Sequence, residues 1–571
     1  MDNHTKPIPK TTSISRRWFI GAAGTCAIMS NNAFADSNTP KGAPEDSHNE
    51  DLNPFGRNLI PAHPSAQDYL YRPSIHFSPP VGWMNDPNGL IYDGEYFHLY
   101  YQYDPIAPYA GFVHWGSAKS KDLYSWEDGP IALKPTTAGE AFSGCAIIDR
   151  NNTSGFFPAL PDTDPRSKEP NLALIYTRAS AKLQTQDIAI SRDGGQTYTE
   201  ISENPILDIH SNSFRDPKVF FHAPSGRWIM TVVQSRLHKV SFYGSFNLKD
   251  WMHLSDFESA GLFGIDYECP NLIEVPLEGT NETRWLMLIS INPGAPQGGS
   301  TTQYFVGFFD GERFKAEDEH TVFGLIDFCK DSYALQCYEN LPLSQATMIA
   351  WLGNWQYGEE VPHTTWRGVM TLPRRLSVRR DTDGWIRLVQ RPLGLENLRL
   401  AQIPTPFRHL PARTTETVAL PKNQAIELII KASLEPRDKM LPDGSLGRAG
   451  RFSIDFANNN GEKLTVGFDG FFCQLWVERG GLKGFANPFF TREFSTSLTP
   501  DLREFSLRIV YDACTLEIYV NDGISVGSSL VFPQEALDRV SFSTTNTAAS
   551  IQQLEIYPLR STMPRPFPKN A

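Results

Sequence analysis

A weak internal repeat is the feature of this sequence that most constrains its fold. A short polar turn followed by an aromatic residue recurs at residues 120–122 before Trp126, 191–193 before Tyr198, 245–247 before Trp251 and 310–311 before Phe314. The aromatic residues are roughly 50 to 70 residues apart, about the length of a four-stranded unit with variable loops. Repetition on this scale predicts a β-propeller, whose blades surround a central channel. The alternative is chance recurrence in an aromatic-rich β protein.

The segments around these turns have the pattern of short strands. Residues 89–94 and 96–101 form two β-like runs, the first of which ends in an Asp-Gly turn typical of hairpins. The chain contains 12 Trp, 20 Tyr, 36 Phe, 42 Gly and 43 Pro, a mixture that favours strands joined by tight turns over long helices. We therefore predict an all-β chain with a propeller over residues 70–395.

A second β region follows a stretch that contains Pro404 and Pro406. Alternating runs occur at 425–431, 452–456, 507–511 and 516–520, and the last ends in an Asn-Asp-Gly turn. Strands with hairpin turns and no helix signal predict a C-terminal β-sandwich. We place a linker at 396–415 and the sandwich at 416–571.

Residues 1–35 have the pattern of an export signal. Arg16 and Arg17 precede an apolar run at 19–29, and Ala-Phe-Ala ends the segment at residue 35. The paired arginines indicate the twin-arginine type, which carries cargo across a bacterial membrane. Because about eleven apolar residues cannot span a ~30 Å hydrocarbon core, we expect cleavage rather than anchoring. The mature protein is then periplasmic or extracellular, without membrane association, and residues 36–69 form a flexible leader.

Charge and cysteine content exclude several classes of protein. The net charge of −12 argues against a nucleic-acid partner. Six cysteines remain after signal removal, too few to be the framework of so long a chain, and Cys473 and Cys514 are the pair expected to form a disulfide. Since neither C-x-x-C nor H-E-x-x-H occurs, we expect no metal and no cofactor.

Three acidic motifs combine a carboxylate with a proline one or two residues later. Asp86 precedes Pro87, Asp216 lies between Arg215 and Pro217, and Glu268 lies between Tyr267 and the pair Cys269-Pro270. Singly, these could be a turn, a surface ion pair and a strand-edge glutamate. We expect the Arg neighbour to keep Asp216 ionised and apolar neighbours to raise the pKa of Glu268. A carboxylate nucleophile and a carboxylic acid of raised pKa are what retaining glycoside cleavage requires.

Ten ordered stretches match one known family. They lie at residues 83–89, 101–102, 115–116, 142–144, 215–217, 268–270, 290–294, 303–307, 353–355 and 366–368. From His76 to about Leu376 the chain resembles glycoside hydrolase family 32, the group of invertases, exo-inulinases and levanases. The resemblance implies a five-bladed propeller followed by a β-sandwich, in agreement with the repeat and the strand pattern.

The resemblance also implies roles for the three acids. Asp86 would be the nucleophile that attacks the anomeric carbon of a fructosyl unit. Glu268 would protonate the leaving oxygen and then deprotonate the incoming water. Asp216 would bind ring hydroxyls and stabilise the transition state.

Seven further residues would bind substrate by the same resemblance. Hydrogen bonds to the fructosyl unit would come from Asn85, Gln102, Ser143 and Arg215, and apolar walls from Trp83, Phe142 and Trp355. For Trp115 a plain core role is equally compatible with the sequence. The chain departs from the family pattern at Asp104, Ala110, Ser117 and Cys145, and the change at Ala110 removes an aromatic side chain from the expected rim of the site.

The implied function is an exported, retaining hydrolase that releases terminal β-D-fructofuranosyl units from sucrose or fructans. Alternatives within this class are an exo-levanase or exo-inulinase that prefers polymer, and a fructosyltransferase. From a different class, the chain could be a non-catalytic fructan-binding propeller. The three intact acids argue against the last alternative, because a pure binder has no use for a general acid.

Overall fold

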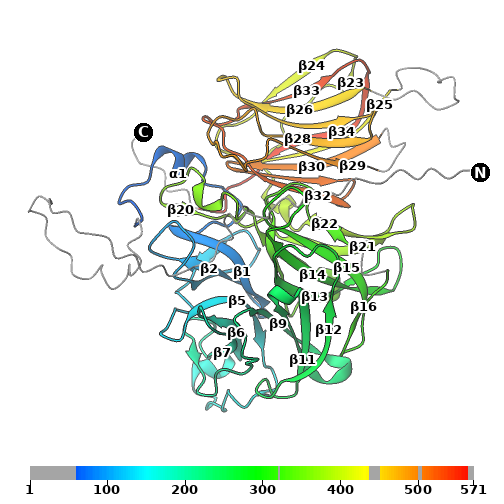
Figure 1. Ribbon diagram of the computed structural model, residues 1–571. Coiled ribbons are helices and arrows are strands. Elements are labelled where there is room, and N and C mark those ends of the chain that lie inside the picture. Colours follow the sequence, from blue (N-terminus) through cyan, green and yellow to red (C-terminus); the bar gives the residue numbers. More distant parts are fainter. Residues whose placement is uncertain (1–58, 319–321, 436–449, 499–503, 564–571) are drawn as a thin grey trace, which may run out of the picture. The chain divides into compact units, whose positions relative to one another are not determined.

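The structure is a computed structural model that describes residues 59–318, 322–435, 450–498 and 504–563 (Figure 1). The expected signal at 1–35 and most of the expected leader lie outside the described residues. Strands dominate, and no helix of the described part is long and apolar enough to cross a membrane.

Five antiparallel sheets, coloured blue to green in Figure 1, form the first structural region. Their strands, in chain order, are β1 (Gly82–Tyr92), β2 (Phe97–Asp104), β3 (His114–Ser120) and β4 (Trp126–Asp128); β5 (Glu140–Ile148), β6 (Leu172–Ala179), β7 (Gln184–Ser191) and β8 (Thr199–Glu200); β9 (Phe214–His222), β10 (Arg227–Gln234), β11 (Lys239–Ser245) and β12 (Met252–Glu258); β13 (Asp266–Pro276), β14 (Thr283–Asn292), β15 (Thr301–Phe309), β16 (Phe314–Ala316) and β17 (Gly324–Leu325); and β18 (Tyr333–Cys337), β19 (Thr347–Trp351), β21 (Arg374–Arg380) and β22 (Ile386–Pro392). The short strand β20 (Trp366–Arg367), which follows β19, pairs in parallel with β1 and so joins the fifth sheet's segment to the first sheet. The predicted five-bladed propeller is confirmed.

The repeat in the sequence marks the turn before the fourth strand of a blade. At Asp122, Asp193, Asn247 and Asp310 one side-chain oxygen accepts two backbone N–H groups from residues two to four positions ahead. A short acceptor side chain thus closes each turn by local hydrogen bonds. The fifth blade has a copy that the sequence pattern missed, where Asp383 accepts the N–H of Trp385 just before β22.

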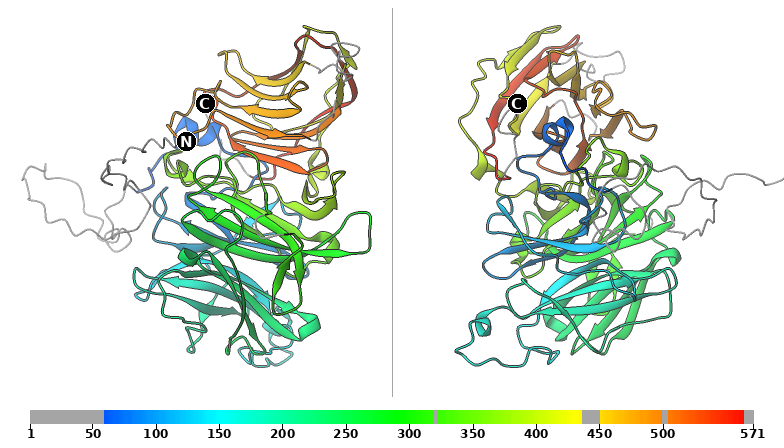
Figure 2. Two further views of the ribbon diagram at one scale, coloured as in Figure 1. Left: turned by 45° about the vertical axis from the view of Figure 1, so that its right-hand side comes forward. Right: turned by 90° about the vertical axis from the view of Figure 1, so that its left-hand side faces the viewer.

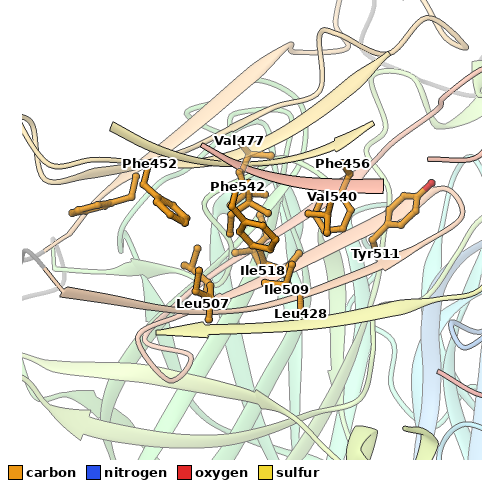
Figure 3. Close-up of a cluster of buried hydrophobic side chains, with 14 of the residues drawn as sticks. Leu428, Phe452, Phe456, Val477, Leu507, Ile509, Tyr511, Ile518, Val540 and Phe542 are labelled. Atoms are coloured by element: carbon orange, nitrogen blue, oxygen red, sulfur yellow. The ribbon is translucent and has the colours of Figure 1, made fainter. Parts of the chain in front are cut away.

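Two six-stranded antiparallel sheets, coloured yellow to red in Figure 2, form the second region. One contains β23 (His409–Leu410), β34 (Ala549–Pro558), β25 (Ile426–Leu434), β30 (Glu504–Asp512), β31 (Thr515–Val520) and β32 (Ser525–Leu530). The other contains β24 (Thr415–Ala419), β33 (Arg539–Thr544), β26 (Arg451–Ala457), β27 (Lys463–Asp469), β28 (Gln474–Glu478) and β29 (Glu493–Ser497). Figure 3 shows the core between them, with Phe452, Phe456 and Phe542 facing Leu507 and Ile509. The predicted β-sandwich is confirmed.

Ordered structure extends into the segments that the sequence analysis assigned to the leader and the linker. Helix α1 (Ala66–Leu70) begins with a capping box in which Ser65 and Asp68 exchange hydrogen bonds. Asp68 is buried and also accepts the backbone N–H groups of Thr364 and Thr365. The 3₁₀ helix η6 (Leu395–Leu398) and strand β23 fall within 396–415. Long-range contacts order these segments, and polar composition alone does not reveal such contacts.

The expected disulfide between Cys473 and Cys514 is wrong. Cys473 and Cys514 are not bonded to each other in the structure. Cys473 lies in the turn between β27 and β28, whereas Cys514 lies in the turn between β30 and β31 of the other sheet. The alternating strand pattern predicted both segments, but it carried no information about which strands become neighbours.

Buried ion pairs join the propeller to the sandwich. Arg374 of β21 donates two hydrogen bonds to Glu517 of β31, at 2.7 and 3.1 Å, and both side chains are fully buried. The remaining Glu517 oxygen accepts the N–H of Leu372 and lies 3.2 Å from His76 Nε2. Apolar contacts surround this network, including Leu372 against Val510. The interface therefore combines packing with paired buried charges.

Substitution Glu517→Gln is expected to lower the free energy of unfolding by about 3–5 kcal/mol, because the buried Arg374 loses its hydrogen-bonded carboxylate and keeps only the more distant Asp327, at 3.9 Å. The measurement is the melting temperature by scanning calorimetry at neutral pH. Glu504→Gln is the matched control on the same sheet, since Glu504 makes only a half-exposed ion pair with Lys431. Equal melting temperatures for the two variants would contradict the prediction.

Candidate active site

The innermost strands of the five blades are irregular at equivalent places. Each innermost strand shifts its pairing register with the next strand of the blade. The shift lies at residues 84–87 in β1, 141–144 in β5, 215–218 in β9, 268–271 in β13 and 333–336 in β18. These bulges lie close to the start of each strand, and therefore at the same end of the propeller. A bulge interrupts the ladder and redirects side chains, and bulges often occur next to active sites.

Local sequence explains three of the five bulges. Pro87, Pro217 and Pro270 have no N–H to donate, so a regular ladder is unfavourable at these positions. Asp216 and Cys269 also have φ values of +65° and +46°, in the left-handed region that non-glycine residues rarely adopt. The same motifs that carry the acids therefore break the strands that hold them.

Asp86 is fixed by hydrogen bonds from three directions. Its Oδ2 accepts a 2.6 Å bond from Ser143 Oγ on β5, and Oδ1 accepts a 2.9 Å bond from Asn85 Nδ2. The Cys269 thiol on β13 lies 3.5 Å from Oδ2. Gln102 of β2 accepts a bond from Asn85 and donates one to Ser143. Three of the sequence-predicted residues, Asn85, Gln102 and Ser143, thus form one network around the Asp86 carboxylate.

Asp216 is buried beside the same thiol. Its Oδ2 accepts the backbone N–H of Cys269 at 2.9 Å and lies 3.8 Å from Cys269 Sγ. The backbone N–H of Asp216 donates to Thr177 Oγ1 on β6 at 2.9 Å. Cys269 therefore lies between the carboxylates of Asp86 and Asp216 and contacts both.

Glu268 has polar neighbours, and the expectation that apolar groups surround it is wrong. Its Oε1 accepts a 2.9 Å bond from Arg215 Nη2, and its Oε2 accepts a bond from the Tyr333 hydroxyl on β18. The side chain is 21% exposed, so solvent reaches the carboxyl group. Tyr267 and Glu268 are successive residues of β13, so their side chains point to opposite faces of the sheet, Tyr267 into the apolar layer and Glu268 toward Arg215.

Burial governs the protonation of the two enclosed aspartates. It raises the pKa of Asp86 to about 6, and the nearby Glu268 carboxyl adds to this rise, although the Ser143 hydrogen bond opposes it. Burial also raises the pKa of Asp216 to about 7 and outweighs the effect of Arg215. The expectation that Arg215 keeps Asp216 ionised is therefore wrong. Arg215 Nε lies 3.9 Å from Asp216 Oδ2, because the guanidinium group directs a donor to Glu268 instead.

Aromatic side chains support the cluster from one side. Trp83 is buried, donates its indole N–H to Asn85 at 2.8 Å, and packs with its ring 5.9 Å from that of the partly buried Trp355. Phe142 is also partly buried. Trp115 is fully buried and donates to the Phe142 carbonyl, so it belongs to the core of the blade.

The departures from the family pattern make structural contacts. Asp104 accepts the N–H groups of Ile106 and Ala107, Ser117 donates to the Pro130 carbonyl, and the Cys145 sulfur accepts the N–H of Val219 on the neighbouring inner strand. Ala110 packs against the apolar cluster that contains Trp83.

Sequence reasoning missed three contacts of the cluster. Cys269 lies within a recognised motif, but its role in joining two carboxylates depends on the fold. Thr177 and Tyr333 have no motif around them, and each reaches an acid on another blade. Among the described residues, no group of three or more His, Cys, Asp or Glu side chains could hold a metal ion.

The raised pKa values make stability depend on pH. Asp86 and Asp216 have folded pKa values of about 6 and about 7, above the ordinary 3.8, so the folded state holds protons that the unfolded state releases. Their contribution to stability is complete below about pH 4 and is lost as pH rises through 6 to 7. We expect Asp216→Asn to raise the melting temperature relative to wild type at pH 7.5 more than at pH 5. A pH-independent difference would contradict this.

The chain matches two domains of one family. Residues 76–392 match the Glycosyl hydrolases family 32 N-terminal domain, and residues 395–558 match the Glycosyl hydrolases family 32 C terminal domain. An extracellular exo-inulinase of Meyerozyma guilliermondii is 37% identical over 506 residues, covering 86% of this chain and 95% of the relative. Invertase 2 of Saccharomyces cerevisiae is 38% identical over 502 residues, covering 83% and 92%.

A solved structure agrees with the domain matches. The β-fructofuranosidase of Schwanniomyces occidentalis, in complex with fructosyl-erythritol, superposes with a TM-score of 0.80 and 33% identity over 88% of this chain and 100% of that chain. The chain therefore belongs to glycoside hydrolase family 32, as an enzyme of the β-fructofuranosidase type that hydrolyses fructosyl linkages.

Proposed function

We propose that this enzyme releases terminal β-D-fructofuranosyl units from sucrose and fructans with retention of configuration. The observation that carries the proposal is the carboxyl pair at the end of the channel. Asp86 is buried and held by two oriented donors, whereas Glu268 is partly exposed and adjoins Cys269, whose thiol lies 3.5 Å from Asp86. Retaining glycosidases use one carboxylate as nucleophile and a second carboxyl group as acid and then base.

In the first step, Asp86 attacks the anomeric carbon of the fructosyl unit and forms a covalent ester. Ser143 and Asn85 hold the carboxylate so that little reorientation is needed at the moment of attack. Glu268 gives its proton to the glycosidic oxygen as the bond to the leaving group breaks. In the second step, Glu268 takes a proton from water, which attacks the anomeric carbon and releases fructose from Asp86.

Other residues of the cluster bind and orient the sugar. We assign Asp216 to ring hydroxyls and, where its carboxyl group is ionised, to stabilisation of the positive charge that develops in the transition state. Asn85, Gln102, Ser143 and Arg215 supply hydrogen bonds, and Trp83, Phe142 and Trp355 supply apolar surface. The partial exposure of Phe142 and Trp355 supports this assignment.

We also propose that the enzyme is exported by the twin-arginine signal at residues 1–35. The motif supports this, and the Meyerozyma guilliermondii relative is named as extracellular. Detection of a mature protein that begins near residue 36 in the periplasm or medium tests the proposal. Retention of uncleaved chain in the cytoplasm would refute it.

The activity is tested by measuring reducing-sugar release from sucrose, inulin and levan, with separation of the products. Release of fructose as the single initial product from fructans supports terminal cleavage, whereas longer fragments would indicate internal cleavage. Kestose formation from concentrated sucrose would indicate transfer. Proton NMR of the first product distinguishes retention, which gives β-fructose, from inversion.

The rate should fall on the acidic side of about pH 6. The nucleophile acts as the anion, and burial raises the pKa of Asp86 to about 6, so protonation removes the active form below that pH. We expect kcat/KM for sucrose to decline about tenfold per pH unit well below 6. The pH profile from 3.5 to 8 measures this. Full activity down to pH 4 would contradict the assigned protonation of Asp86.

A further inference from the structure

Three exposed apolar side chains lie in two neighbouring loops of the propeller. Leu237 is 66% exposed and ends the 3₁₀ helix η3 (Ser235–Leu237), which joins β10 to β11. Phe263 and Ile265 are 46% and 38% exposed and lie in the segment between β12 and β13. We refer to these three residues as the rim patch. Burying an aromatic side chain is favourable, so an exposed cluster of this kind is a candidate binding surface.

The strand order places the rim patch at the end of the propeller that holds the carboxylates. The innermost strand β9 begins beside Asp216 and runs away from it, β10 returns, β11 runs away and β12 returns. Both the β10–β11 connection and the β12–β13 connection therefore lie at the site end. The turn of the same blade that contains Phe246 lies at the opposite end.

Close packing holds the loop that carries Phe263. The His238 ring lies 5.4 Å from the Phe263 ring and 5.2 Å from the Tyr267 ring, and its Nε2 donates to the Ile265 carbonyl at 3.2 Å. A Cβ on Gly264 would come within 2.7 Å of the Pro293 carbonyl oxygen, so only glycine allows this approach of the two loops. Phe263 is thus presented on a supported loop, which lowers the cost of ordering it when a ligand binds.

A chain of polar contacts joins the rim patch to Glu268. Arg236 Nε, next to Leu237, lies 2.7 Å from Asp266 Oδ1, which also accepts a bond from Ser235. Arg215 lies 3.5 Å from the same oxygen and donates to Glu268. The surface is therefore charged next to Glu268 and becomes apolar within a few residues of it.

We propose that the rim patch binds the fructan chain on the leaving-group side, at a unit beyond the disaccharide. This rests on the proposed function, in which Glu268 protonates the departing sugar, so the rest of the substrate must leave past that residue. Ile265 lies three residues before Glu268, roughly 10 Å along an extended chain. That distance exceeds the width of one sugar ring, so sucrose ends before it reaches the patch.

The chemistry of the patch suits a neutral furanose chain. Aromatic and aliphatic side chains bury the C–H faces of sugars, and the neighbouring Arg236 and Asp266 offer donors and acceptors for hydroxyl groups. Phe263 provides a rigid apolar face at low conformational cost. The patch would therefore favour oligomeric and polymeric fructans over sucrose without contacting the bond that is cleaved.

The test compares wild type with Phe263→Ala, Leu237→Ala and Phe263→Tyr on sucrose and on inulin. We expect the Phe263→Ala change to lower kcat/KM for inulin by about three- to tenfold through KM, with sucrose within about twofold of wild type. Phe263→Tyr keeps the ring and should restore the inulin value. Phe246→Ala is the matched control, because Phe246 is 69% exposed in the same blade but at the other end.

Each alternative outcome is distinct. Equal effects on sucrose and inulin, or no effect on either, would overturn the inference while leaving the proposed function intact. A shift in sedimentation coefficient with Phe263→Ala would mean that the patch joins two copies of the chain, and would also overturn it. If wild type cleaves neither substrate, the proposed function fails and this inference fails with it.

Discussion

Replacing Asp86 by asparagine is expected to reduce the hydrolysis of sucrose and fructans by about 10⁴-fold or more, because no covalent intermediate can form. The amide can occupy the same space and keep contacts with Asn85 and Ser143. We therefore expect an unchanged circular dichroism spectrum and a melting temperature at least as high as that of wild type near neutral pH. This follows because the substitution removes a buried carboxyl group whose ionisation near neutral pH costs free energy in the folded state.

The measurement is kcat/KM for sucrose by glucose release, with Asp128→Asn as the matched control. Asp128 lies on the outermost strand β4 of the same blade and is exposed. The control should retain activity within about twofold of wild type. Turnover by Asp86→Asn close to that of the control would show that another group is the nucleophile.

Replacing Glu268 by glutamine is expected to lower kcat/KM for sucrose by about 10²–10⁴-fold, since the glycosidic oxygen then leaves without a proton. The amide still accepts one hydrogen bond from Arg215 or Tyr333, so the strands β9, β13 and β18 should keep their positions. A β-fructoside whose leaving group needs no proton should lose far less activity than sucrose. This dependence on the leaving group is the feature that separates loss of an acid from general damage.

The experiment compares sucrose with such an activated fructoside for wild type, Glu268→Gln and Glu274→Gln. Glu274 lies on the same strand β13 but toward its far end, where it accepts a bond from Thr283. Its variant should behave as wild type on both substrates. An equal loss on both substrates with Glu268→Gln would refute its assignment as the proton donor.

The architecture was predictable from the sequence because its signals are local. Each recurring turn is closed by a side chain that bonds the backbone two to four residues ahead, so the motif is visible without knowledge of the fold. The fifth copy was missed because Trp385 follows Asp383 by two residues, whereas the aromatic residue follows the turn acceptor by four or five residues in the other copies. Alternating apolar residues likewise indicated the sandwich, since a two-residue period follows from the geometry of a strand.

The acids were also identifiable, because each lies one or two residues before a proline that interrupts a strand. The environment of each acid could not be predicted from the sequence. Glu268 was expected among apolar groups and instead meets Arg215 and Tyr333 from two other blades. Asp216 was expected to be ionised by its neighbour in sequence, yet burial beneath the inner strands dominates its pKa.

Local sequence thus determined which residues form turns, which segments alternate between apolar and polar residues as strands, and which positions carry carboxyl groups. Tertiary structure alone decided which of them meet, because Asp86, Glu268 and Tyr333 are brought together only when the first, fourth and fifth blades close around one channel. It also decided how those groups titrate, since the cost of ionisation depends on how much water the surrounding strands exclude. The Arg374–Glu517 ion pair also depends on tertiary structure. Its partners lie far apart in the sequence, and their interaction affects stability strongly because both are buried.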